Sequence, residues 1–152
     1  ELVVYLSMGF GNPYGDDWSE SLLIDQIGEL ERRIAPDVIA LSDTVGNATP
    51  ELLNSSFRKA LDASSSSQLG AHLHAAPWEV DAKIKATWDA GCRRFDSAMR
   101  GIGGCPMAQE KLVGNIPTES LYACINDLAP LEFDQRAWNH AHSLAVDLFQ
   151  EG

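Results

Sequence analysis

Two histidines, two positions apart, are the first residues whose spacing suggests chemistry. His72 and His74 lie at the end of the run 68–74, which we expect to form a strand. Residues two apart in a strand point to the same face, so the two imidazoles would lie side by side. Such a pair is suited to binding a metal ion, although neighbouring carbonyl groups could also satisfy both rings. His72 and His74 are therefore candidate metal ligands.

A glycine-rich stretch farther along the chain carries one thiol and one amide. Gly101-Ile102-Gly103-Gly104-Cys105-Pro106 runs on to Gly114-Asn115, and its composition argues against a helix or a regular strand. Backbone of this kind approaches a ligand closely, or else forms a loop with an incidental cysteine. Cys105 could act as an acid/base thiol if a nearby cation lowered its pKa. Asn115 could add an amide oxygen, and ligation by nitrogen and oxygen without thiolate favours Mg²⁺ or Mn²⁺ over structural zinc.

Asp43 is a further candidate because it ends another apolar run. It precedes the loop Val45-Gly46-Asn47-Ala48. Its carboxylate could be a base, a partner that supports the ligands, or simply a cap for the following helix. The other cysteines, Cys92 and Cys124, lie on or beside expected helices and are interpreted as core residues. His140 and His142 are interpreted as surface residues of the last helix.

Composition limits the classes of partner. The 152 residues carry 11 Lys+Arg against 22 Asp+Glu, a net charge of −11, with 45% hydrophobic residues. An acidic surface repels phosphate backbones and anionic lipids, so we expect neither nucleic acid nor membrane as a partner. No apolar run reaches the roughly 18 residues of a membrane-spanning helix. Three cysteines without framework spacing suit a reducing compartment.

The elements that must position these residues alternate between strand and helix. Strands are expected over 2–8, 38–41, 68–74 and 94–98, each followed by a loop and a helix with apolar residues at helical period. The first helix begins near 18, where Asp17 and Glu20 have the spacing of a capping box. The next two begin at Thr49-Pro50 and at Pro77, Thr118 caps a fourth, and a last one spans 134–149. This order predicts a parallel sheet with helical crossovers, which fits either a doubly wound open sheet or part of an eight-fold barrel. In both architectures ligands bind at the carboxyl ends of the strands, where the candidate residues lie.

The motifs together resemble 3-hydroxy-3-methylglutaryl-CoA lyase and its relatives in the metal-dependent DRE-TIM barrel superfamily. The resemblance rests on Ser42-Asp43-Thr44-Val45-Gly46-Asn47-Ala48-Thr49-Pro50, on Ala71-His72-Leu73-His74, and on the Gly-Gly-Cys-Pro loop ending in Gly114-Asn115. It covers nearly the whole chain, in order. The Gly-Gly-Cys-Pro loop is its specific part, since the other motifs are shared with related synthases and aldolases.

The resemblance implies a fold, a reaction and roles for residues. The fold is an α/β partial TIM barrel, about four βα units (1–117) with terminal helices (118–152), forming a single domain. The implied reaction cleaves 3-hydroxy-3-methylglutaryl-CoA to acetyl-CoA and acetoacetate. A divalent metal, Mg²⁺ or Mn²⁺, would be held by His72, His74 and Asn115. Cys105 would be the catalytic thiol, with Asp43 near the metal-bound substrate.

One part of the family pattern has no counterpart here. The family's first strand carries an arginine and a metal-binding aspartate, and this chain contains no such strand. The chain therefore resembles the C-terminal half of the barrel, and we expect it to be inactive alone and to pair with itself or with the missing N-terminal half. The expected location is the cytoplasm or the mitochondrial matrix. Two other functions remain open: a related aldolase or 2-oxoacid synthase, and a non-catalytic half-barrel module.

Overall fold

A parallel sheet forms the centre of the computed structural model, which describes residues 1–104 and 113–149. Its strands are β1 (Val3–Leu6), β2 (Val38–Asp43), β3 (Gln68–Ala75) and β4 (Phe95–Asp96). They pair in the order β1-β2-β3-β4, each parallel to the next. A fifth strand, β5 (Gly114–Asn115), pairs antiparallel with the end of β3.

Helices connect the strands and begin where the local sequence favours it. α1 (Glu20–Ile34) starts after Ser19, whose side chain accepts a hydrogen bond from the Leu22 amide. α2 (Pro50–Ala63) starts after Thr49, which caps the Leu52 amide, and Pro50 occupies the first turn. The remaining helices are α3 (Val80–Asp89), α4 (Thr118–Leu128) and α5 (Gln135–Leu148), with a short 3₁₀ turn at Met99–Gly101.

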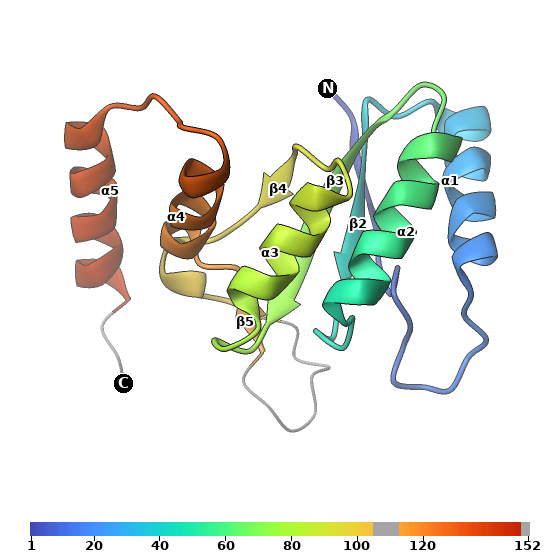
Figure 1. Ribbon diagram of the computed structural model, residues 1–152, viewed down its shortest axis with the longest axis horizontal. Coiled ribbons are helices and arrows are strands. Elements are labelled where there is room, and N and C mark those ends of the chain that lie inside the picture. The colour runs from blue at the N-terminus through green and yellow to red at the C-terminus, as the bar shows by residue number, and fades with distance from the viewer. Residues whose placement is uncertain (105–112, 150–152) are drawn as a thin grey trace.

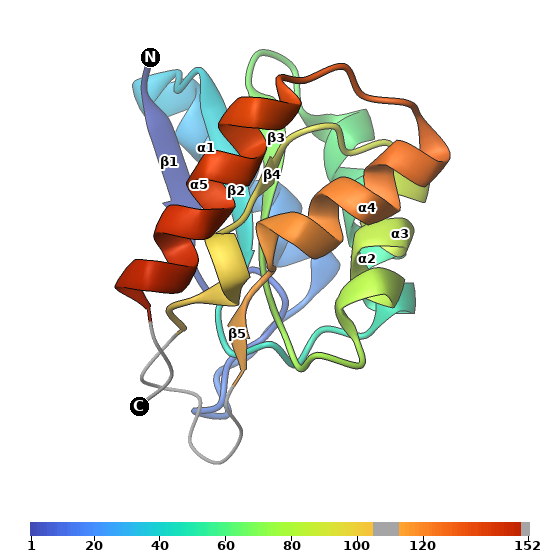
Figure 2. The same ribbon diagram turned by 90° about the vertical axis from the view of Figure 1, so that its left-hand side faces the viewer.

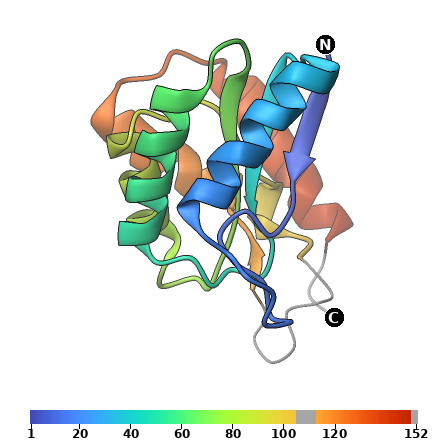
Figure 3. The same cartoon turned by 90° about the vertical axis from the view of Figure 1, so that its right-hand side faces the viewer.

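The sheet order distinguishes between the two architectures that the sequence allows. In a doubly wound sheet the strand order reverses at a switch point, whereas in a barrel consecutive strands are neighbours throughout. Here the order is sequential, and α1, α2 and α3 all cover the same face of the sheet (Figure 1). α5 lies on the other side of the sheet from α2 (Figure 3). The arrangement is that of a barrel segment, as predicted.

The core lies between the sheet and the helices α1–α3. β2 is buried along its whole length. The side chains of β2 that face the helices pack against apolar residues of α1 and α2. Several members of this cluster are 0–1% exposed, among them Ile27, Ile39, Leu41, Leu53, Phe57 and Leu73. Apolar area removed from water is the main favourable term in folding, so this layer fixes the positions of the strand ends. None of the helices in the described residues is both long and apolar enough to cross a membrane.

The structure corrects several local predictions. β4 has two residues where a strand over 94–98 was expected, and Ser19 caps α1 although Asp17 seemed the better candidate. Thr118 is the first residue of α4 and not its cap, which is Pro117. The composition of the glycine-rich stretch argues against a regular strand, yet its end forms β5. This strand has only two residues, Gly114 and Asn115, which pair with the end of β3.

Candidate active site

A cleft of about 510 Å³ opens at the carboxyl ends of the strands. Parallel strands bring their carboxyl ends to one edge, and β5 runs back along the end of β3 at that edge (Figure 2). The three predicted metal ligands all line this cleft, together with hydroxyl and glycine residues; the full lining is Tyr5, Ser7, Ser42, Thr44, His72, His74, Gly103, Gly104 and Asn115. Strand pairing thus brings together residues that are far apart in sequence.

His74 is buried and held in one tautomer. Its Nδ1 lies 3.0 Å from the main-chain oxygen of Asp43. A carbonyl oxygen only accepts, so Nδ1 carries the proton and Nε2 is the nitrogen available to a ligand. Burial lowers the pKa of His74, and the Asp43 carbonyl opposes this only in part. The ring is therefore kept in its neutral form, the form that coordinates metal ions.

His72 stands beside His74 and faces a carboxylate that the sequence analysis did not select. The two rings lie edge to face with centroids 5.1 Å apart. His72 pairs in register with Asp96, and its Nδ1 is 3.5 Å from Asp96 Oδ2. Both atoms are buried, and neither has a hydrogen-bond partner within the described residues. A carboxylate on one ring nitrogen leaves the other nitrogen for a ligand, which is the usual surrounding of a metal-binding histidine.

Tyr5 completes this side of the cleft from β1. Its ring lies edge to face with His72, with centroids 5.4 Å apart. A hydrogen bond to Asp96, burial and the charge of that carboxylate together raise the pKa of Tyr5. The phenol therefore stays protonated and can donate. Tyr5 was missed because β1 carries no polar motif that would single it out.

Asn115 is positioned by the glycines around it. Its Nδ2 donates to the Ile102 carbonyl at 2.9 Å, which leaves Oδ1 as the atom available to a ligand. Its main-chain amide donates to Gly103 at 3.0 Å. Gly103 has a φ of +89°, and a Cβ there would lie 2.9 Å from Asn115 Nδ2. Only glycine fits this close approach, which explains one glycine of the motif.

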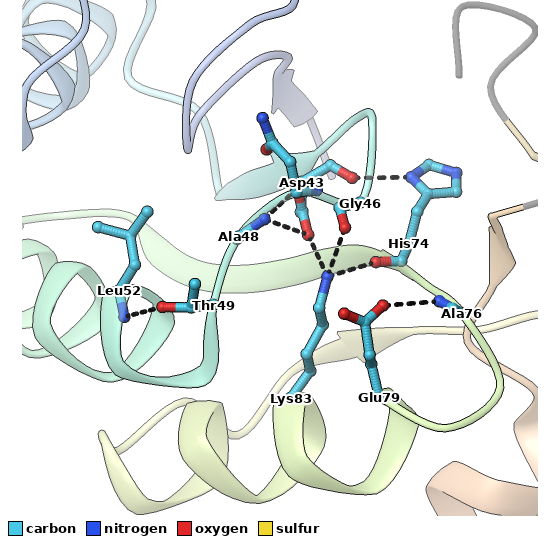
Figure 4. A network of polar contacts seen from close by, with 10 residues as sticks. Asp43, Gly46, Ala48, Thr49, Leu52, His74, Ala76, Glu79 and Lys83 are labelled. Carbon is cyan, nitrogen blue, oxygen red and sulfur yellow. Dashed lines mark hydrogen bonds and ion pairs between the residues drawn. The ribbon is translucent and has the colours of Figure 1, made fainter. Parts of the chain in front are cut away.

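Asp43 supports the site from behind the cleft. Its carboxylate is 1% exposed and is bound by the Lys83 ammonium at 2.8 Å. It also accepts hydrogen bonds from the Asn47 and Ala48 amides, so its lone pairs are occupied by neighbours (Figure 4). Asp43 does not line the cleft; its contact with the predicted ligands is the main-chain oxygen that receives His74. Of the roles considered, this geometry favours the supporting partner over the base.

Lys83 is the third residue that the sequence analysis did not select, after Asp96 and Tyr5. It lies on the core face of α3 with Val80, Ile84 and Thr87 and is 1% exposed. The signal was available, because position 83 falls on the apolar stripe of its helix. A lysine in such a stripe needs a buried acceptor, and Asp43 is that acceptor.

The donor set fits a divalent cation. Two imidazoles and one amide oxygen face a single cleft, and each has its other polar atom directed at a neighbouring group. The described part of the chain holds no group of three or more His, Cys, Asp or Glu close enough to bind a metal. The predicted donor set has three members only with the amide oxygen of Asn115. Cys105, the predicted catalytic thiol, lies outside the described residues. Cys92 is buried, as predicted, and burial raises its pKa to about 11.

Comparisons with known proteins match the chain along most of its length. It is 35% identical over 125 residues to the (R)-citramalyl-CoA lyase of Chloroflexus aurantiacus, covering 82% of this chain and 39% of that protein. It is 29% identical over 127 residues to the cytoplasmic 3-hydroxy-3-methylglutaryl-CoA (HMG-CoA) lyase of Rattus norvegicus, covering 82% and 36%. The chain is homologous to the HMG-CoA lyases. No protein-family model matches it.

Solved structures give the same relationship for this HMG-CoA lyase homologue. The HMG-CoA lyase of Acinetobacter baumannii, solved with coenzyme A and 3-methylmalate, is 30% identical with a TM-score of 0.76, covering 96% of this chain and 47% of that one. The chain thus spans about half of a solved relative and 36–39% of the two sequence relatives. The predicted family and the barrel-type α/β fold are confirmed.

Proposed function

We propose that this chain is the C-terminal, ligand-bearing half of a metal-dependent lyase that cleaves a carbon–carbon bond in a 3-hydroxyacyl-CoA. The observation that carries the proposal is the convergence of His72, His74 and Asn115 on one cleft, with the second polar atom of His74 and of Asn115 held by a hydrogen bond and that of His72 facing Asp96. The substrate would be HMG-CoA, cleaved to acetyl-CoA and acetoacetate. The 35% identity to a citramalyl-CoA lyase favours citramalyl-CoA as the second candidate.

In this proposal His72 Nε2, His74 Nε2 and Asn115 Oδ1 would hold the cation, which would be Mg²⁺ or Mn²⁺. When bound, the cation would polarise the substrate's oxygens and lower the barrier to deprotonating the tertiary alcohol. The hydroxyl groups of Tyr5, Ser42 and Thr44 line the same cleft and would orient substrate oxygens. Cys105 would donate the proton that the leaving carbon requires.

The partner of this half-site is the second part of the proposal. β1 and β4 are the two edges of the parallel sheet. Tyr5 on β1 is 50% exposed, and Leu2, the residue before this strand, is 48% exposed. Unpaired edges and exposed apolar side chains favour association with further strands. We propose that a second copy, or an N-terminal half of the barrel, covers these edges. A monodisperse 16.5 kDa monomer in light scattering would contradict this part of the proposal.

The decisive experiment is Mn²⁺ binding measured by electron paramagnetic resonance. The chain is compared with a His72→Ala/His74→Ala variant and with a His140→Ala control on the exposed face of α5. Binding that is lost in the double variant and kept in the control supports a preformed half-site. Equal binding in all three proteins would refute the proposed ligands. If the ligands are supported, cleavage of HMG-CoA and of citramalyl-CoA, assayed with the N-terminal half present, identifies the substrate.

A further inference from the structure

The buried ammonium of Lys83 joins three segments of the chain. Its Nζ donates to Asp43 Oδ2 at 2.8 Å, to the Gly46 carbonyl at 2.9 Å and to the His74 carbonyl at 3.1 Å (Figure 4). An ammonium group has three protons, so all of its donors are used. The three acceptors belong to the end of β2, the loop after it and the end of β3. One side chain therefore fixes how two neighbouring strand ends lie relative to each other.

Two of these acceptors belong to the residues that hold the His74 ring, which are Asp43 and His74 itself. Lys83 binds the main-chain carbonyl of His74 itself. The ring Nδ1 of His74 donates to the main-chain oxygen of Asp43, and Lys83 binds the side-chain carboxylate of the same Asp43. Gly46 lies close to the same carbonyl group: its φ is +70°, and a Cβ there would be 3.2 Å from the His74 carbonyl oxygen. Movement of the ammonium would shift the ring and its hydrogen-bond acceptor together.

A buried ion pair is a costly way to obtain stability alone. Removing two charges from water carries a desolvation penalty, and well-packed apolar residues of similar volume often serve as well or better. Such a pair is better explained when the geometry that it imposes is useful. The part of the site that depends on this geometry is the orientation and tautomer of His74.

We infer that Lys83 is a positioning residue that presets the imidazole of His74, with Nδ1 protonated and Nε2 directed to the cleft. Its value to catalysis depends on the proposed function, because the metal-binding role of His74 is itself proposed. The preset ring is a property of the metal-free chain and can be measured without any metal. β5 pairs with β3 at His74 opposite Asn115, so the same ammonium also steadies the strand end that carries the third ligand.

The test uses ¹⁵N NMR of the histidine side chains in the metal-free chain. The variant is Lys83→Met/Asp43→Asn, which removes both charges and keeps similar shapes. The matched control is Lys85→Met, an exposed lysine on the same helix that pairs with Asp89 at 3.1 Å. We expect the wild type and the control to show one His74 tautomer with a protonated Nδ1. In the folded double variant, His74 should show a mixture of tautomers.

A second readout separates this inference from the proposed function. Mn²⁺ affinity should fall about tenfold or more in the double variant, as for other residues that orient metal ligands, and stay unchanged in Lys85→Met. A double variant that is folded by circular dichroism and keeps a single Nδ1-protonated His74 overturns the positioning role. If the wild type binds no Mn²⁺ but its His74 tautomer depends on Lys83, the metal proposal fails and the positioning role stands.

A measurement on the unmodified chain covers the case in which the variant does not fold. Hydrogen bonds from Lys83 to the Gly46 and His74 carbonyls should protect its ammonium protons from exchange with water and give scalar couplings across the bonds. Rapidly exchanging, uncoupled Lys83 protons would overturn the inference directly.

Discussion

His74 and Asn115 are register partners across the short antiparallel pair of β3 and β5. They come from distant parts of the sequence, yet strand pairing places their side chains at one cleft. The pairing depends on glycine, because Gly114 lies opposite Ala75 and a Cβ on it would approach the Gly101 carbonyl oxygen to 2.9 Å. The glycine-rich motif thus serves to bring an amide against a histidine.

Asn115→Ala should separate two roles of this residue. The loss of Oδ1 should weaken Mn²⁺ binding by about tenfold or more, equivalent to about 1.4 kcal/mol. The loss of the hydrogen bond to Ile102 should lower the free energy of unfolding by about 1 kcal/mol. Electron paramagnetic resonance measures the first effect and urea unfolding the second. Unchanged Mn²⁺ affinity in a destabilised variant would remove Asn115 from the ligand set.

Asp96→Asn should affect the site through His72. An amide facing Nδ1 can turn either its oxygen or its NH₂ group toward the ring, so it no longer specifies the tautomer that leaves Nε2 free. We expect Mn²⁺ affinity to fall by about tenfold, as for other carboxylates that orient metal-binding histidines. Asp89→Asn, on the exposed end of α3, is the control and should bind as the wild type does. Equal affinities in both variants would show that Asp96 has no such role.

Glu31 should control stability in acid. Burial alone would raise the pKa of Glu31, but hydrogen bonds from Ser64, from the Ser67 and Ser66 amides and from Ser65 outweigh it and lower the pKa from 4.5 to about 2. A carboxyl group whose pKa is lower in the folded state stabilises the fold above its unfolded pKa of 4.5. That contribution is lost as the pH falls from 4.5 through about 2.

The corresponding experiment compares thermal unfolding of the wild type and Glu31→Gln between pH 6 and pH 2, values chosen to bracket this window. The variant should be less stable at pH 6, and the difference should shrink toward pH 2. A constant difference across this range would mean that the serine turn at Ser64–Ser67 does not depend on the charge of Glu31.

Leu22 and Leu23 offer a matched pair for the packing of α1. They are adjacent in the helix, but Leu23 is 3% exposed and Leu22 is 42% exposed. Leu23→Ala should cost about 2–5 kcal/mol because it leaves a cavity in the core. Leu22→Ala should stay within about 0.5 kcal/mol of the wild type. Similar losses in urea unfolding would indicate that Leu22 is covered in solution, as expected if a partner binds there.

The sequence was sufficient for the fold where the signal is local. Thr49 and Pro50 mark the start of α2 in both the prediction and the structure, and the run 38–41 lies within β2. His72 and His74 share a face because a strand alternates. These features depend on neighbouring residues, which a single sequence displays directly.

The supporting residues depend on contacts between distant segments. Asp96 was assigned to the middle of a longer strand, and that boundary error hid its place at the strand end beside His72. The position of Lys83 on the apolar stripe of its helix indicates burial, but its acceptors come from β2, the loop after it and β3, so they appear only when the chain is folded. The antiparallel direction of β5 likewise follows from tertiary pairing and not from its two residues.

The ammonium of Lys83, with three oxygen atoms around it, resembles a bound monovalent cation that is tethered to the chain. A free cation would exchange with the solvent, and its occupancy would follow the salt concentration. A tethered cation is always present, and burial shields its interactions from dissolved ions. The shape of this end of the cleft should therefore stay the same from dilute buffer to high salt, while exposed pairs such as Lys85 with Asp89 weaken.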